Sequence, residues 1–184
     1  ASAEQTFSAL KAGAHGFTHL FNAMSPLQGR EAGMVGAALL DASSYCGLIV
    51  DHEHVDMTSC QLAIKCKTPE RIMLVTDGMS HVGSDQIELQ FAGMQINRQG
   101  NRLTIEGGRL AGSALDMASA VRNCVQDLQC STEDAIKMAS STPATFLDLQ
   151  QKGYLASGFA ADWVVLTDQY YVNATYIAGE QVFG

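Results

Sequence analysis

The feature that most constrains the fold is a pattern that occurs three times in the N-terminal part of the chain. A short apolar run ends in polar side chains, and a stretch with helical character follows. The runs are residues 16–21, 45–50 and 71–76, and such nearly continuous apolar runs are typical of strands buried on both faces of a parallel sheet. Residues 32–42 and 57–67 have the length and apolar spacing of crossover helices. The pattern predicts an α/β fold.

The pattern changes after Asp77. Residues 86–91 and 102–106 alternate apolar and polar side chains with a period of two, and residues 97–101 between them are polar. A period of two indicates strands with one exposed face, so we expect an antiparallel hairpin connected through residues 97–101. This hairpin interrupts the alternation of strands and helices and is therefore predicted to be an insert.

Helix starts and terminal strands are predicted further along the chain. Ser113 and Ser131 each precede an Asp by three residues, which is the spacing of a capping box, and Thr142 with Pro143 resembles an N-cap followed by Pro at the first helical position. The first of these helices carries an apolar stripe at Leu115, Ala118, Val121, Val125 and Leu128. Strands are predicted at residues 161–166, 174–177 and 181–183.

Composition narrows the class of protein. The chain has 184 residues, of which 47% are hydrophobic, so it suits one folded domain or slightly more and not a disordered tail. A formal net charge of −8 argues against general binding to nucleic acid or to anionic membranes. Its apolar runs are too short to span a membrane, and its five cysteines form no CxxC pair. Buried free thiols in a reducing compartment, the cytoplasm, are therefore expected.

Polar side chains that can bind a metal or act in acid/base catalysis follow all three apolar runs. They are His19 and Asn22 after the first run, Asp51, His52 and His54 after the second, and Asp77 after the third. Because the carboxyl ends of parallel strands meet at one edge of a sheet, these side chains are expected to converge there. Imidazoles and a carboxylate suit a divalent metal with a general acid/base.

Each of these residues also has a structural interpretation. A histidine inside an apolar run, such as His19, is more often a hydrogen-bonded core residue than a metal ligand. Asp77 either acts chemically or caps the following turn. His15 and His81 lie near glycines in expected loops, so both are predicted to be on the surface. Arg30 in the first loop offers a planar cation for an oxyanion, although an isolated arginine means little alone.

Together these motifs resemble the N-acetylglucosamine-6-phosphate deacetylase family of the amidohydrolase superfamily. The resemblance rests on residues 18–24, 29–31, 33, 45–51, 54–56, 75–77, 110–113, 142–144, 153–158 and 161–162. The block at residues 18–24, Thr-His-Leu-Phe-Asn-Ala-Met, is specific to this family. The glycine-rich pattern at residues 153–158 is shared with many amidohydrolases and supports only the superfamily.

The resemblance implies the C-terminal part of a (β/α)₈ barrel and part of a small β-sandwich. Residues 1–150 would form about three barrel strands with their helices and a β-hairpin insert near residues 86–106, and residues 151–184 would form strands of the sandwich. A complete barrel has eight strands and about 250 residues. The chain also lacks the family's first metal ligands, a Glu and a His from earlier strands, so we expect a fragment that is inactive by itself.

The resemblance also implies an activity, metal-dependent hydrolysis of N-acetylglucosamine 6-phosphate to glucosamine 6-phosphate and acetate in amino-sugar metabolism. It assigns His19 to the metal and Asp77 to acid/base catalysis. It assigns substrate contacts to Asn22, Ala23, Arg30, His54, Leu110, Ala111 and Gly112. Arg30 and His54 would hold the phosphate, with the arginine acting across a homodimer interface. Zinc is the family's usual metal, and iron, manganese or cobalt also suit such donors.

Two alternatives compete with this interpretation. The chain could belong to another amidohydrolase of the dihydroorotase or deaminase kind, but those enzymes do not need the phosphate clamp that Arg30 implies. It could also be a catalytically inactive module with a structural or interface role, because one histidine is too few ligands for tight metal binding.

Overall fold

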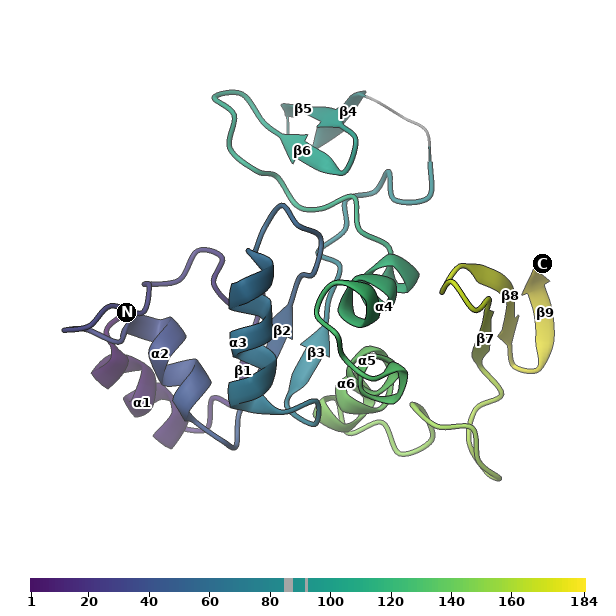
Figure 1. Cartoon of the computed structure of the whole chain (residues 1–184), viewed down its shortest axis with the longest axis horizontal. Helices are drawn as coiled ribbons and strands as arrows, with labels where there is room; N and C mark the ends of the chain where they lie inside the picture. The colour runs from purple at the N-terminus through teal and green to yellow at the C-terminus, as the bar shows by residue number, and fades with distance from the viewer. Residues whose placement is uncertain (85–87, 92) are drawn as a thin grey trace.

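The computed structural model describes residues 1–84, 88–91 and 93–184. Figure 1 shows the helices gathered around one short sheet, with two further sheets set apart from it. In chain order the elements are α1 (Ala3–Lys11), β1 (Gly16–Phe17), α2 (Gly33–Leu40), β2 (Tyr45–Leu48), α3 (Met57–Lys67), β3 (Ile72–Leu74), β4 (Glu88–Phe91), β5 (Met94–Gln99), β6 (Arg102–Thr104), α4 (Met117–Gln126), α5 (Thr132–Ala139), α6 (Ser141–Phe146), β7 (Trp163–Leu166), β8 (Val172–Ile177) and β9 (Glu180–Phe183).

The first sheet is parallel, with strand order β1-β2-β3. The predicted α/β alternation is therefore confirmed, with α2 and α3 as the crossovers within the expected ranges. The side chain of Asp56 caps α3 by accepting a hydrogen bond from the Thr58 amide at 2.9 Å. The first strand is shorter than expected, since it ends at Phe17, so His19 and Asn22 lie in the loop that follows it.

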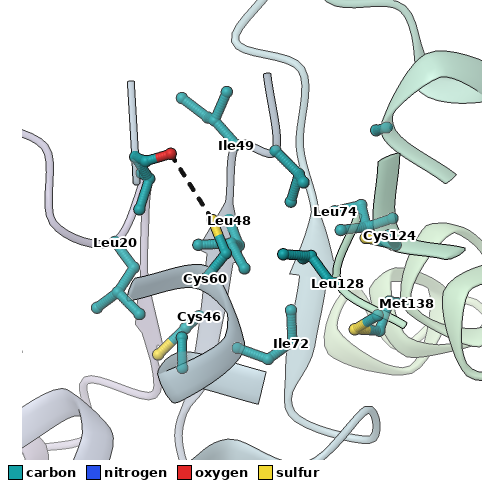
Figure 2. Close-up of a cluster of buried hydrophobic side chains, with 14 of the residues drawn as sticks. Leu20, Cys46, Leu48, Ile49, Cys60, Ile72, Leu74, Cys124, Leu128 and Met138 are labelled. Atoms are coloured by element: carbon teal, nitrogen blue, oxygen red, sulfur yellow. Dashed lines mark hydrogen bonds between the residues drawn. The ribbon is translucent and has the colours of Figure 1, made fainter. Parts of the chain in front are cut away.

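The core lies between this sheet, α3 and the pair α4–α5 (Figure 2). Leu48, Ile72 and Leu74 from the strands are almost completely buried. They pack in one cluster with Leu128 and Met138 from the α4–α5 region. Burying such an apolar side chain stabilises a fold by about 1.5–3 kcal/mol, so this cluster fixes the strand ends against the helices.

The cysteines are free thiols, as predicted, but only Cys46, Cys60 and Cys124 are buried, while Cys66 is exposed and Cys130 is partly buried. Cys46 and Cys60 lie in the core, where burial raises the pKa of Cys46 to about 11 and that of Cys60 to about 12. The Cys60 thiol lies 4.0 Å from the Val55 carbonyl oxygen (Figure 2). Neutral, buried thiols of this kind pack like small apolar side chains.

The insert is a three-stranded antiparallel sheet, β4-β5-β6, and not a simple hairpin. Residues 97–99, expected in the connection, belong to β5, and the turn is confined to Gly100 and Asn101. Residues 86 and 87 of the predicted first strand lie outside the described residues. The prediction failed because β5 carries many polar side chains on its exposed face, so its apolar alternation is weak.

Helix caps were only partly predicted. Ser131 caps α5 as expected, accepting from the Asp134 amide at 3.0 Å. The cap of α4 is Asp116 and not Ser113, and it accepts from the Ser119 amide at 2.8 Å. Thr142 lies inside α6, where its hydroxyl donates to the Pro69 carbonyl oxygen at 2.9 Å. Helix α1, whose capping box joins residues 2 and 5, was not predicted.

The terminal strands β7, β8 and β9 form an antiparallel sheet, as predicted. Trp163 stacks on Tyr176 with ring centroids 4.6 Å apart, which braces β7 against β8. Val182 and Phe183 of β9 remain 57% and 59% exposed. Between β7 and the helices α4–α6 lies an apolar groove of about 890 Å³. None of the helices in the described ranges has the length and apolar character that crossing a membrane requires.

Candidate active site

The residues singled out in the sequence lie in the loops that leave β1, β2 and β3. Since the three strands are parallel and paired in register, these loops emerge at the same edge of the sheet. In Figure 1 the β4–β6 sheet stands off from the parallel sheet, near the loop that follows β2. An ion pair between Arg102 of β6 and Glu53 of that loop, 3.6 Å long, connects the two.

The loop after β2 contains a buried carboxylate–imidazole pair. The Asp51 Oδ2 atom lies 2.6 Å from His54 Nδ1, and the two side chains are 2% and 7% exposed. The other oxygen, Oδ1, accepts the backbone N–H groups of Glu53 and His54, each at 2.9 Å. Burial alone would raise the pKa of Asp51, but these hydrogen bonds outweigh it and hold that pKa below its ordinary value. The hydrogen bond to Asp51 raises the pKa of His54, against the opposing effect of burial.

His52 has a different partner. Its Nε2 atom lies 3.1 Å from Asp127 Oδ2 at the end of α4, in a pair that is about half exposed. The spacing of His52 and His54 would place both rings on one side only if the strand continued, and β2 ends before them, at Leu48. Asn123 of α4 donates to the Val50 carbonyl oxygen at 2.8 Å and holds the start of the loop.

His19 carries a sign of a missing ligand. It lies two residues beyond β1 with a positive φ of 36°, and the Leu20 amide continues the contact with β2 by donating to the Gly47 carbonyl oxygen at 2.8 Å. The Nδ1 atom of His19 is buried and has no hydrogen-bond partner among the described residues. A buried unsatisfied nitrogen costs about 1–3 kcal/mol, and an external partner would remove this cost. This donor therefore fits a metal ion or another external group.

The described residues do not complete a metal site by themselves. No group of three His, Cys, Asp or Glu side chains within the described ranges lies close enough to hold an ion. His19 also lines a cavity of about 350 Å³ together with Ala23 and residues of α1. The donor chemistry thus fits a divalent metal at His19, with further ligands required from outside these residues.

The other predicted residues of this loop lie close to His19 in sequence and differ in exposure. The amide of Asn22 donates to the His19 carbonyl oxygen at 2.9 Å, and its side chain points back to the same short turn. Ala23 is exposed and has a positive φ of 53°. Arg30 is exposed on a tight turn closed by mutual backbone hydrogen bonds between Gln28 and Glu31. Its guanidinium is available to a group from solvent or from another molecule.

Asp77 lies next to the predicted substrate loop, residues 110–112. Asp77 follows β3 with a positive φ of 48°, and its carbonyl oxygen accepts the Ser113 amide at 2.9 Å. Gly112 also has a positive φ, and a Cβ atom there would lie 3.0 Å from that same oxygen. Leu110 pairs with Thr104, so the loop runs directly from the β4–β6 sheet to Asp77. Ala111, between them, donates to the Leu103 carbonyl oxygen at 3.1 Å.

Two roles were not predicted from the sequence. Asp51 is the partner of His54, and Ser113 connects its own loop to the loop after β3. The Ser113 hydroxyl, fully buried, donates to the Thr76 carbonyl oxygen and accepts the Leu115 amide at 3.1 Å. The spacing Asp-x-x-His could have signalled the first role, because an Asx-type turn brings these two side chains together.

The prediction of a surface position for His81 was wrong. The residue is fully buried, and neither of its ring nitrogens has a hydrogen-bond partner in the described part of the chain. Burial lowers the pKa of His81, so the ring is held neutral. His15 is exposed, as predicted.

The chain belongs to the amidohydrolase family, whose family model matches residues 28–182. It is 48% identical over 183 residues to an N-acetylgalactosamine-6-phosphate deacetylase of Shewanella sp. (strain ANA-3), a match that covers 100% of this chain and 46% of the relative. It is 35% identical over 179 residues to an N-acetylglucosamine-6-phosphate deacetylase of Lysinibacillus sphaericus, covering 97% of this chain and 46% of the relative.

Solved structures give the same result. The N-acetylglucosamine-6-phosphate deacetylase from Pasteurella multocida superposes with a TM-score of 0.96 at 31% identity, over 100% of this chain and 48% of that one. The enzyme from Thermotoga maritima gives 0.93 at 32% identity, over 100% of this chain and 50% of that one. The fold described above is therefore part of a deacetylase fold, and the chain spans about half the length of the proteins it matches.

Proposed function

We propose that this chain is the C-terminal portion of a metal-dependent N-acetylhexosamine-6-phosphate deacetylase. The observation that carries the proposal is the grouping of His19, His54 and Asp77 at one edge of the parallel sheet, with a buried ring nitrogen of His19 that has no partner in the described part of the chain. Similarity over the whole chain to enzymes of this activity supports it. The reaction cleaves an acetamide into an amine and acetate.

In this proposal His19 supplies one ligand to a divalent metal, zinc first and iron, manganese or cobalt as alternatives, and the remaining ligands come from outside this chain. When bound, such a metal polarises the acetamide carbonyl and lowers the pKa of the attacking water. The Asp77 carboxylate takes the proton of that water and delivers it to the departing amine nitrogen. Its exposure at the sheet edge leaves it accessible to both.

The sugar phosphate is held by groups remote from the reacting bond. Arg30 and His54 bind the phosphate, which supplies positioning energy for the chemistry. Asn22 and Ala23, with the loop that ends at Gly112, contact the sugar. The exposed side chain of Arg30 suits a role across a homodimer interface, since it lies on a turn that projects from the chain.

The whole enzyme in this proposal has a (β/α)₈ barrel and a small β-sandwich. Residues 1–150 supply barrel strands with the β4–β6 insert, and residues 151–184 supply sandwich strands. The exposed apolar side chains of Val182 and Phe183 and the apolar groove beside β7 support a partner sheet from outside this chain. A cytoplasmic location agrees with the free thiols.

The first candidate substrate is N-acetylglucosamine 6-phosphate. A second is N-acetylgalactosamine 6-phosphate, its C4 epimer, because the relative at 48% identity is named for that activity. Dihydroorotase-like or deaminase-like chemistry and an inactive module are the remaining alternatives. The exposed Arg30 favours a phosphorylated substrate over the cyclic ureides and nucleobases of those enzymes.

The test is a turnover assay on the full-length protein that contains this chain, read as acetate release for the sugars and as ring opening to carbamoyl aspartate for dihydroorotate. Both sugar phosphates, unphosphorylated N-acetylglucosamine and dihydroorotate are offered, and Asp77→Asn is the control. We expect turnover of at least one sugar phosphate, and its loss in Asp77→Asn with the metal retained. Turnover confined to dihydroorotate, or unchanged turnover in the variant, would contradict the assignment.

A further inference from the structure

The pair formed by Asp51 and His54 is almost completely buried. The carboxylate is 2% exposed, and its two oxygens have different partners. Oδ1 accepts the two backbone amides that shape the loop, and Oδ2 receives the Nδ1–H of the His54 ring at 2.6 Å. One oxygen therefore builds the loop, while the other acts only on the imidazole.

This geometry determines which proton the ring can offer. With Nδ1–H donated to a carboxylate, a neutral His54 would present a bare, accepting Nε2. Only the imidazolium carries a second proton on Nε2, and only that form can donate to a phosphate oxygen. None of the described residues forms a hydrogen bond with Nε2, so that nitrogen is left for a ligand.

The surroundings favour the charged ring. The ionisable groups that act on His54 are all carboxylates, namely Asp51 and Glu53 from its own loop and Asp77 from the loop after β3. They raise the pKa of His54, and one of them, Glu53, is also paired with Arg102 at 3.6 Å. Burial opposes the effect without cancelling it.

We propose that Asp51 is a positioning residue that holds His54 as an imidazolium, in one ring orientation, with its Nε2–H directed to the phosphate of the substrate. This inference rests on the proposed function for its ligand and goes beyond it in naming the group that prepares the phosphate site. It places the recognition of a dianion on a positive charge that the buried Asp51 carboxylate favours. Arg30 lies in a different loop and does not supply this charge.

The variant that isolates the role is Asp51→Asn. Asparagine keeps Oδ1 for the two backbone amides, so the loop retains its shape. Its amide nitrogen donates to Nδ1, which reverses the hydrogen bond and leaves His54 neutral with the proton on Nε2, so the variant keeps the Nε2–H donor and removes only the positive charge. The matched control is Asp127→Asn, the same substitution in the exposed pair with His52.

The measurement combines NMR of imidazole-labelled full-length protein with steady-state kinetics. We expect the His54 ring to titrate above its ordinary value in the unaltered protein and lower in Asp51→Asn, with a switch to the Nε2–H neutral tautomer. At neutral pH, KM for the sugar phosphate rises roughly tenfold to a hundredfold while kcat changes little. KM for the unphosphorylated sugar is unchanged, and Asp127→Asn moves none of these values.

Failure of the inference and failure of the proposed function have different signatures. If His54 titrates at its ordinary value and does not respond to Asp51→Asn, the inference is wrong whatever the substrate. If kcat and KM change equally for phosphorylated and unphosphorylated sugars, Asp51 is only structural and the inference is again wrong. If the unaltered protein turns over no sugar phosphate and inorganic phosphate leaves the His54 resonances unmoved, the phosphate site itself is contradicted, and the titration then reports only a structural pair.

Discussion

The loop after β2 and the loop after β1 carry side chains of the same chemical kinds in very different states. In the loop after β2, both oxygens of Asp51 are used and His54 is held by one of them. In the loop after β1, His19 has a buried nitrogen without a partner among the described residues, and Arg30 is exposed. The chain thus fixes the histidine proposed for the phosphate and leaves the metal ligand and the arginine of the other loop without partners of this kind.

The cause lies in the position of the strands. β2 is the central strand of the parallel sheet, so its loop has neighbours from this chain on both sides. Asn123 and Asp127 from α4 contact it, and Arg102 contacts it from β6. β1 is an edge strand, and β2 is its one paired strand within the described residues. The comparison teaches that the position of a strand in the sheet, together with the residue types of its loop, decides how far this chain fixes the side chains there.

The largest effect is expected at the open loop. His19→Gln in the full-length protein removes a ligand, so metal content measured by elemental analysis should fall together with a loss of activity on the order of a hundredfold. His15→Gln, an exposed histidine four positions earlier, is the control and should alter neither. Full metal occupancy in His19→Gln would show that the unpartnered nitrogen is not a metal ligand. It would contradict the difference drawn between the loops after β1 and after β2.

A second effect is expected where the substrate loop touches Asp77. In Gly112→Ala, the new Cβ would lie 2.8 Å from the Met79 side chain and 3.0 Å from the Asp77 carbonyl oxygen, at a positive φ. The free energy of unfolding, measured with urea, should fall by about 1–3 kcal/mol from strain and overlap together, and kcat should fall with it.

Gly107→Ala separates the two contributions to that loss. Gly107 also has a positive φ but has open space around its Cβ position. It should therefore lose only the conformational part, about 1 kcal/mol, and keep kcat. Equal losses in the two variants would mean that contact with Asp77 is unimportant.

The Asp51–His54 pair in the loop after β2 predicts how the free energy of unfolding depends on pH. The lowered pKa of Asp51 gives stability that is lost as acid protonates the carboxylate, and the raised pKa of His54 gives stability that is lost as alkali removes the ring proton. The pair therefore contributes most between about pH 4 and 6.5, the ordinary values of the two groups. In that window Asp51→Asn should lower the free energy of unfolding by about 1–3 kcal/mol, and less on either side. A pH-independent difference would contradict an ionic pair.

The smallest effect is expected at His52. Its φ of 67° is a strained value for a side chain with a Cβ, and its pair with Asp127 is about half exposed. In His52→Gly the relief of about 1 kcal/mol of backbone strain offsets the loss of a surface ion pair of about 0–1 kcal/mol. Urea unfolding should therefore change by less than about 0.5 kcal/mol. A loss as large as that of Asp51→Asn would mean that both histidines of the loop anchor it.

Much of the fold could be predicted because its signals are local. The apolar runs gave β2 and β3, and the spacing between them gave α2 and α3. Ser131 was identified correctly as a cap because a cap is defined by its next few residues. The capping box at the start of α1 is equally local, and α1 was nevertheless not predicted.

The parts that failed depend on contacts between distant residues. Ser113 has the spacing of a cap, but packing of β3 against the substrate loop turns its hydroxyl to Thr76 instead. His81 lies among residues typical of loops, and it is nevertheless buried in the fold. The orientation of His52 away from His54 depends on Asp127, which lies far along the sequence. None of these partners can be identified from residue type and spacing alone.

The most direct test of the central claim compares the 184-residue chain with the full-length protein in one metal-supplemented acetate-release assay on N-acetylglucosamine 6-phosphate and N-acetylgalactosamine 6-phosphate. If this chain supplies only half of the site, the full-length protein hydrolyses at least one substrate and the 184-residue chain hydrolyses neither. Metal-dependent turnover by the chain alone, or no turnover by the full-length protein, would contradict the account.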